Sequence, residues 1–383
     1  MQIHRAAEQD DKKAILRELA SGVAVDVRDS EDMTPLMRAV FSSESDVETV
    51  QLLLNQGADP NAVSSESESP VLWLSLIRGD PSRVQCLLEA GADVHFVSEG
   101  DLDALMVVSD EHYGAQSEPL LTLVDMLLER GISTVRESED GLTALGYAFD
   151  RGNFGMVKRL LEVGADEACL SWTPLMRAVA VGTVDEVREL LKQGADIFEK
   201  EPLNERTPWL LAVSSGDTEK AELLLEAGAD RNDIGWYEKT ALFYPVETGD
   251  SEMLKWLLSI GCDVDASGEF GTTSMTTAAG ENSLDLVQIL LDAGANPDKK
   301  DRSDRKAIDY TSSLEIVHVL LPTGDDLSEL KPEVRRLLFG TKNTISLTRE
   351  DLEIGWNPRL GTANPERMDV ALWRARVLHS SSY

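Results

Sequence analysis

The sequence predicts an all-α solenoid in which short helix-turn-helix units, joined by hairpin loops, stack one on another along the chain. Three observations support this prediction. A tripeptide of the type Gly-Ala-Asp recurs at intervals of 30 to 40 residues. Two short segments with helical apolar spacing precede each copy. The composition, with 42% hydrophobic and 27% charged residues, is typical of a folded chain and excludes a disordered or fibrous class.

The repeated glycines mark the end of each unit. Most steps between them are 33 or 34 residues, with one insertion and one deletion. Because a period of this length is the signature of stacked supersecondary units, it predicts a solenoid. The tripeptide Gly-Ala-Asp begins at Gly57, Gly91, Gly164, Gly194 and Gly228, and related tripeptides begin at Gly131, Gly261 and Gly294, with Gly22 upstream of them all.

The segment 173–196 shows how one unit is built. Thr173 is expected to cap the first helix through its side-chain oxygen, and Pro174 suits the first helical position because its missing N–H group is not needed there. Val187, Leu190 and Leu191 lie three and four residues apart and predict one apolar face of a second helix. Gly194 supplies the left-handed residue that ends this helix.

These residues resemble the ankyrin repeat, whose pattern runs from Thr-Pro-Leu to Gly-Ala-Asp-x-Asn. Thr34-Pro35-Leu36 and Asp59-Pro60-Asn61 match both ends of it, and so do Thr207-Pro208-Trp209 and Asp230-Arg231-Asn232. The resemblance covers about residues 1 to 321 and implies about ten units. We expect an array over 1–324, with a degenerate N-terminal cap at 1–28, repeats at 29–298 and a shortened last repeat at 299–324.

Two departures from the ankyrin pattern stand out. The buried His that follows Thr-Pro-Leu in the family is replaced here by larger apolar residues, so we expect apolar packing in place of a polar network. These residues are Met37, Trp73, Met176, Leu210 and Phe243. The fourth unit carries extra polar residues around 109–119, which predict a loop between its two helices that is either functional or mobile.

Residues 325–383 predict a separate, smaller region. They carry nine basic and nine acidic residues, so all of the net charge of −33 belongs to residues 1–324. Apolar spacing predicts helices over 327–339 and 365–378. The segment 361–366 followed by Trp373 resembles extensions of bacterial ankyrin arrays, which implies a bacterial chain. We expect a small helical cap on the last repeat, while a partner-binding appendage and a flexible tail remain alternatives.

The charge of −33 excludes several classes of partner. A field of this sign repels phosphates and anionic headgroups, so we expect no nucleic acid and no membrane as partners. Three well-separated cysteines argue against a disulfide framework, and the start of the chain lacks the apolar stretch of a signal peptide. We therefore expect a monomeric cytoplasmic protein.

The sequence shows no motif for catalysis or for a cofactor. Phosphate-binding Gly-rich loops, a nucleophile elbow, a His-Glu-x-x-His site and an EF-hand are all missing from it. None of the five histidines has metal-ligand spacing to a cysteine. We therefore expect no cofactor, no metal and no catalytic residues. The alternative is an enzyme whose active site lies in the extension around Trp356, Asn357 and Asn364.

Candidate binding residues lie at the hairpin tips, which in the ankyrin fold border the concave surface and do not hold the stack together. The early tips are acidic, which is typical either of a solvated face or of a surface that attracts a basic ligand. The later tips carry aromatic residues, which favour either partner contact or packing between hairpins. The candidates are Glu31, Glu66, Glu68, Glu99, Asp101, Asp103, Glu139, Asp140, Trp172, Trp236, Tyr237 and Phe270.

The resemblance therefore implies a non-catalytic protein-interaction module, and the charge predicts that its partner is a basic protein. A protein that neutralises a basic toxin or nuclease fits this charge. A scaffold or a host-interacting effector is the alternative, which the sequence leaves open.

Overall fold

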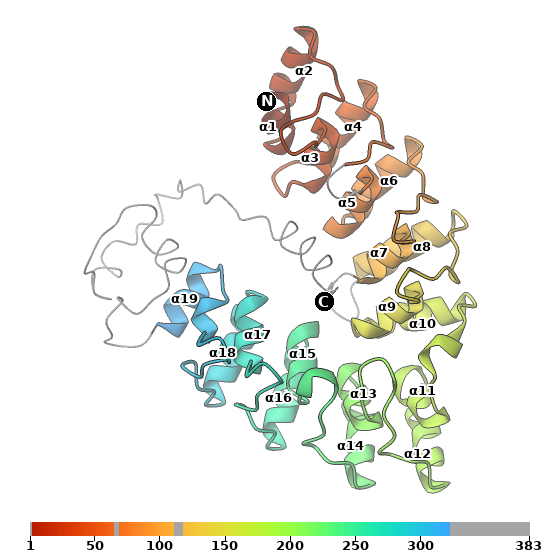
Figure 1. Cartoon of the computed structure of the whole chain (residues 1–383), viewed down its shortest axis with the longest axis vertical. Coiled ribbons are helices and arrows are strands. Elements are labelled where there is room, and N and C mark those ends of the chain that lie inside the picture. Colours follow the sequence, from red (N-terminus) through yellow and green to blue (C-terminus); the bar gives the residue numbers. More distant parts are fainter. Residues whose placement is uncertain (1, 65–68, 111–117, 322–383) are drawn as a thin grey trace. The chain divides into compact units, whose positions relative to one another are not determined.

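A computed structural model of the chain describes residues 2–64, 69–110 and 118–321 (Figure 1). The chain divides into two compact units, Met1–Trp236 and Tyr237–Tyr383. Every regular element in the described residues is a helix or a 3-10 turn, apart from isolated bridges at Val63–Pro70 and Ser267–Thr273. The predicted all-α class is confirmed.

The first unit consists of helix pairs that follow one another in chain order (Figure 1). Successive first helices pack together from α1 to α9, and successive second helices from α4 to α10. The pairs are α1 (Gln2–Glu8) with α2 (Lys12–Ala20), α3 (Pro35–Phe41) with α4 (Val47–Asn55), α5 (Val71–Arg78) with α6 (Pro81–Glu89), α7 (Ala104–Asp110) with α8 (Glu118–Leu128), α9 (Ala144–Asp150) with α10 (Phe154–Glu162), α11 (Pro174–Val181) with α12 (Val184–Lys192), and α13 (Pro208–Ser214) with α14 (Thr218–Glu226).

The second unit has the same pattern, and the last pair in its described residues is a reduced one. In that pair a 3-10 turn stands in the place of the first helix. The elements are α15 (Phe243–Thr248) with α16 (Ser251–Ser259), α17 (Ser274–Gly280) with α18 (Leu284–Asp292), and η3 (Ala307–Asp309) with α19 (Leu314–Leu320).

Local sequence sets the ends of these helices. The Thr173 side chain accepts a hydrogen bond of 3.2 Å from the Met176 N–H group at the start of α11, with Pro174 next to the cap. Gly194 follows α12 with a φ of 81°, in the left-handed region where a side chain would be strained. Both capping predictions are confirmed.

The core consists of apolar side chains between neighbouring helices. The five residues that replace the family's His are all buried: Met37, Trp73, Met176, Leu210 and Phe243. Trp209 is also fully buried, whereas Trp256, for which the repeat pattern also predicts a core position, is only half-buried. The predicted apolar packing is therefore confirmed at the His position.

A ladder of side chains links successive loops. The Asp26 carboxylate accepts from the Asp59 N–H group, and the Asn61 side-chain oxygen accepts from the Asp93 N–H group at 2.7 Å. Asp265 makes the equivalent 2.9 Å bond with Asn296 in the second unit. Two intervening repeats carry Val135 and Phe198 at the corresponding position, and these apolar side chains have no atom that can accept a hydrogen bond.

The hairpin after Gly164 is three residues shorter than its neighbours and forms a short 3-10 turn, η1 (Glu167–Leu170). Of the helices in the preceding pair, α11 packs on α10, whereas α3, α5, α7, α9 and α13 each pack on the first helix before them. The rings of Trp172 and Phe149 meet edge to face with centroids 5.2 Å apart. Trp172 is half-buried, so its predicted exposure at a hairpin tip is wrong.

A buried ion pair lies against Phe149, the residue that Trp172 also contacts. Arg206, from a later hairpin of the first unit, donates to Glu201 at 2.9 Å and to the Phe149 carbonyl oxygen at 3.2 Å. Its guanidinium lies 4.1 Å from the centroid of the Phe149 ring. Glu201 and Arg206 are both almost completely buried. The pair therefore links the hairpin that contains Glu201 and Arg206 to α9, which lies two repeats earlier in the chain.

Some predictions fall outside the described residues. Most of the insertion at 109–119 does so, although its flanking residues end α7 and begin α8, which places it between two helices as expected. The boundary at 324 and the helical cap at 325–383 lie beyond Leu321, so they stay predictions.

Candidate protein-binding site

Three of the predicted tip aromatics are exposed. Trp236 and Tyr237 are each 48% exposed and Phe270 is 55% exposed, values that are unusual for such large apolar side chains. In the second unit, the rings of Tyr237 and Phe270 lie 5.8 Å apart between centroids and are tilted by 40°. The structure therefore brings two residues together that are 33 positions apart in the sequence.

The backbone under these rings is fixed by hydrogen bonds between neighbouring hairpins. The Tyr237 carbonyl accepts from the Glu269 N–H group at 2.8 Å, and the Phe270 carbonyl accepts from the Arg302 N–H group at 2.9 Å. In the first unit, the Trp236 N–H group donates to the Asn204 carbonyl oxygen at 2.8 Å. The exposed aromatics thus project from an ordered backbone, which lowers the entropy cost of a contact with a partner.

The Tyr237 backbone is strained. Tyr237 and Glu238 have φ values of 57° and 55°, in the left-handed region that favours glycine. They are the only adjacent residues other than glycine with positive φ in the described ranges. Strain of this kind persists where the surrounding structure imposes it, and it concentrates at functional sites.

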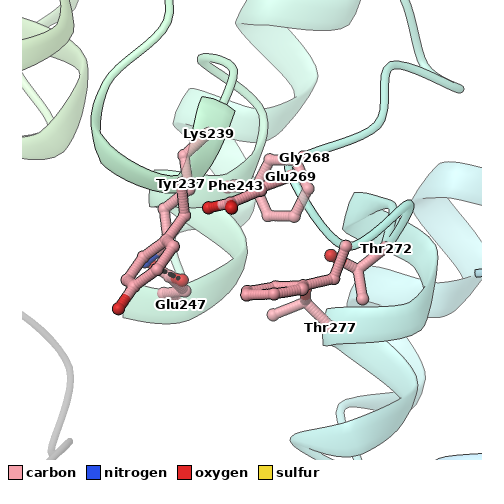
Figure 2. A pocket seen from close by; sticks show the side chains of 9 residues that line it. Tyr237, Lys239, Phe243, Glu247, Gly268, Glu269, Thr272 and Thr277 are labelled. Carbon is pink, nitrogen blue, oxygen red and sulfur yellow. Dashed lines mark ion pairs between the residues drawn. The ribbon is translucent and has the colours of Figure 1, made fainter. Parts of the chain in front are cut away.

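The two rings border an open groove of about 220 Å³ in the second unit (Figure 2). Lys239 and Glu247 meet beside Tyr237, while Thr272 and Thr277 lie on the other side. The Lys239 Nζ to Glu247 Oε1 distance is 2.6 Å. The residues that line the groove are Tyr237, Lys239, Phe243, Glu247, Gly268, Glu269, Phe270, Thr272 and Thr277.

The early acidic tips belong to the first unit, and most of them are exposed. Glu31 pairs with Arg38 at 2.8 Å, so its charge is partly neutralised. Glu139 donates its N–H group to the Gly100 carbonyl oxygen, which places two acidic tips next to each other. The exposed acids are Glu31, Glu99, Asp101, Glu139 and Asp140, while Glu66 and Glu68 lie outside the described residues.

Asp103 differs from the other predicted acids. It is 2% exposed, and its carboxylate accepts 3.0 Å hydrogen bonds from the Leu105 and Met106 N–H groups at the start of α7. Its predicted exposure is wrong, because Asp103 occupies the capping position that Thr143 and Thr173 hold in other repeats. This alignment was the signal that could have identified the cap.

Sequence reasoning did not identify the rest of the groove. The position of Glu269 beside Tyr237 depends on how two hairpins meet, which no local pattern encodes, and the pairing of Lys239 with Glu247 depends on the path of the chain from the hairpin into α15. Within the described ranges, no group of three His, Cys, Asp or Glu residues is placed to hold a metal ion. None of the helices in those ranges combines the length and apolar character that crossing a membrane requires.

Comparison with known families accounts for this architecture. A family model described as ankyrin repeats in three copies matches residues 3–98, 112–201 and 175–268, and a single ankyrin repeat model matches residues 270–302. The chain belongs to the ankyrin repeat family. Ankyrin repeats generally serve as protein-interaction modules, and the family is generally not enzymatic.

Ankyrin proteins of very different size are similar to this chain. The human transient receptor potential cation channel subfamily A member 1 is 29% identical over 199 residues, which cover 49% of this chain and 17% of the channel. The putative ankyrin repeat protein YahD of Escherichia coli is 27% identical over 49% of this chain and 94% of its own length. The mouse B-cell lymphoma 3 protein homolog is 32% identical over 55% of this chain and 48% of its own length. The matched region is thus a small part of some relatives and nearly the whole of another.

Proposed function

We propose that this ankyrin protein binds a basic protein partner through its exposed hairpin tips and carries out no catalysis. The observation that supports this most is the exposed pair of Tyr237 and Phe270, held on a hydrogen-bonded backbone. Aromatic residues of this kind are enriched among the residues that dominate binding energy. The two rings contact each other across neighbouring hairpins, yet about half of each side chain remains exposed.

The charge of the array supports a basic partner. Residues 1–324 carry 27 basic and 60 acidic residues, and the exposed acids at the tips of the first unit contribute to that field. Long-range attraction raises the rate at which a basic protein meets such a surface. Short-range contacts with the aromatics then slow its dissociation.

Within this class we favour neutralisation of a basic toxin or nuclease in the cytoplasm by a monomer of this chain. A protein that acts on nucleic acid exposes a positive phosphate-binding surface. An acidic array bound there would occlude that surface stoichiometrically. The scaffold and effector alternatives share the binding surface but require no such occlusion.

The test starts with capture of binding proteins from the native cell on the full chain. Association and dissociation rates of the captured protein are then measured for designed variants. Tyr237→Ala with Phe270→Ala removes the aromatic pair, and Phe198→Ala is the matched control because Phe198 is an exposed aromatic, at 62%, elsewhere in the array. Glu99→Lys with Glu139→Lys reverses two charges at hairpin tips. The control pair, Glu129→Lys with Glu226→Lys, reverses two exposed charges away from the tips, one just after α8 and one at the end of α14.

The proposal predicts a different kinetic effect for each pair. Loss of the aromatics should raise the dissociation rate at least tenfold, about 1.4 kcal/mol. Reversal of the tip charges should slow association in low salt more than the control pair does. Equal effects of the tip and control variants would contradict the proposed surface, and an acidic captured protein would contradict the proposed partner.

A further inference from the structure

We propose that the groove of the second unit is a subsite for an arginine side chain of the partner. This inference rests on the proposed function and makes it more specific, because it names the group that the aromatic pair contacts. The juxtaposition that suggests it is an exposed aromatic pair with two carboxylates in the same groove.

The rings supply the first half of the recognition. A guanidinium is planar and weakly hydrated, so it stacks on aromatic faces more readily than an ammonium group does. The chain already contains this contact twice, with Arg206 over Phe149 at 4.1 Å and Arg305 over Tyr310 at 4.4 Å. Tyr237 and Phe270 offer the same chemistry, and they are 48% and 55% exposed.

The carboxylates supply the second half. Glu247 is already paired with Lys239, whereas Glu269 forms no ion pair with any residue in the described ranges. Two acids against one base leave the groove with a net charge of −1, so a cation restores neutrality there. The planar fork of arginine can reach a carboxylate while its stem lies along a ring.

The hairpin backbone argues against a change of shape on binding. Gly268 donates its N–H group to the Thr272 carbonyl oxygen at 2.9 Å, and a Cβ atom at Gly268 would lie 3.1 Å from the Tyr237 carbonyl oxygen. The two hairpins are therefore tightly apposed beneath the rings. A partner side chain enters a groove that is already formed.

Saturation-transfer NMR on the full-length protein with argininamide, lysinamide and norleucinamide, each acetylated on its α-amino group so that only the side chain differs in charge, tests this inference. The three probes share an aliphatic stem and differ in the end group, so their comparison separates a guanidinium site from a general cation site or an apolar one. We expect the strongest transfer to the argininamide stem. Tyr237→Ala, Phe270→Ala and Glu269→Gln should each weaken argininamide binding by about two- to fivefold, while Phe198→Ala leaves it unchanged.

Several outcomes would overturn the inference. Equal transfer to norleucinamide would show an apolar site, and equal transfer to lysinamide would show a site without selectivity for guanidinium. Argininamide contact that appears only after Arg367, Arg374 and Arg376 are replaced by Gln would identify the C-terminal segment of this chain as the occupant. Variants that unfold are recognised by circular dichroism, and Glu269→Gln is the informative one because it changes only an end group.

The arginine subsite and the proposed protein interface can fail independently of each other, and the two experiments distinguish the cases. Argininamide binding that depends on Tyr237 and Phe270, combined with partner capture that does not, would support the subsite and contradict the proposed interface. The reverse pattern would support the interface and overturn the assignment of arginine.

Discussion

At the scale of single residues, burial decides what a carboxylate does. Burial raises the pKa of Asp103 above its ordinary value, although the Met106 and Leu105 N–H groups and the Arg136 guanidinium oppose that shift. The folded protein therefore holds this proton more tightly than the unfolded chain does. The stabilisation that results is fully present below the unfolded value of 3.8 and is lost as the pH rises through the folded pKa.

Asp103→Asn tests this assignment. An amide keeps the cap on α7 and carries no charge, so we expect the variant to lose the pH dependence that Asp103 contributes at acidic pH. Urea unfolding of the variant and the wild type at several values between pH 4 and 7 measures it. We expect the variant's stability relative to the wild type to increase with pH across this range. A constant difference would show that Asp103 titrates normally in the fold.

Backbone strain at the aromatic hairpin gives a second prediction at this scale. Glycine adopts the left-handed conformation of Glu238 without a steric cost, so Glu238→Gly should stabilise the protein by about 1 kcal/mol. Glu238→Ala is the control, because it removes the carboxylate but keeps the Cβ atom. Thermal unfolding of both variants should show a gain for glycine alone, and an equal gain for alanine would assign the effect to charge.

At the scale of elements, the hairpin between Gly194 and Thr207 depends on the buried pair of Glu201 and Arg206. Arg206→Ala leaves an unpaired buried carboxylate and removes the bond to the Phe149 carbonyl, so we expect a loss of about 3 to 5 kcal/mol. Arg188→Ala removes a surface ion pair with Asp185 and should cost less than about 1 kcal/mol. Urea unfolding compares the two. Similar losses would mean that Arg206 does not tie the hairpin to α9.

The sequence was a good guide to helices and a poor guide to hairpins. Helix positions follow from caps such as Thr173 and stops such as Gly194, because both act within a few residues. The roles of Trp172 and Asp103 depend on what a hairpin meets in a neighbouring repeat. Trp172 lies in a hairpin that is three residues shorter, and its ring packs against Phe149. Tyr237 and Phe270 lie in hairpins of normal length and are exposed.

At the scale of the whole molecule, the extension and the array differ in charge and, in our prediction, in role. The last helix of the described residues, α19, exposes Leu314 and Val319, two apolar side chains that a cap would cover. Deletion of residues 325–383 leaves the net charge at −33, so any loss of stability must come from contacts and not from charge.

We expect this deletion to lower the melting temperature and the solubility, with a loss of about 1 to 3 kcal/mol for apolar surface left uncovered. Leu314→Ser with Val319→Ser in the shortened chain should restore solubility. An unchanged melting temperature would contradict the cap and favour an appendage or a tail.

The ladder of loop side chains has a practical consequence for experiments on this protein. The amide hydrogens of Asp59, Asp93 and Asn296 are each bonded to a side chain of the preceding repeat, so they are protected from solvent deuterium only while two adjacent repeats stay docked. Their exchange rates therefore report local opening at individual repeat junctions. Partner binding that slows exchange at one of these amides and not at another would locate the binding site along the array without a structure of the complex.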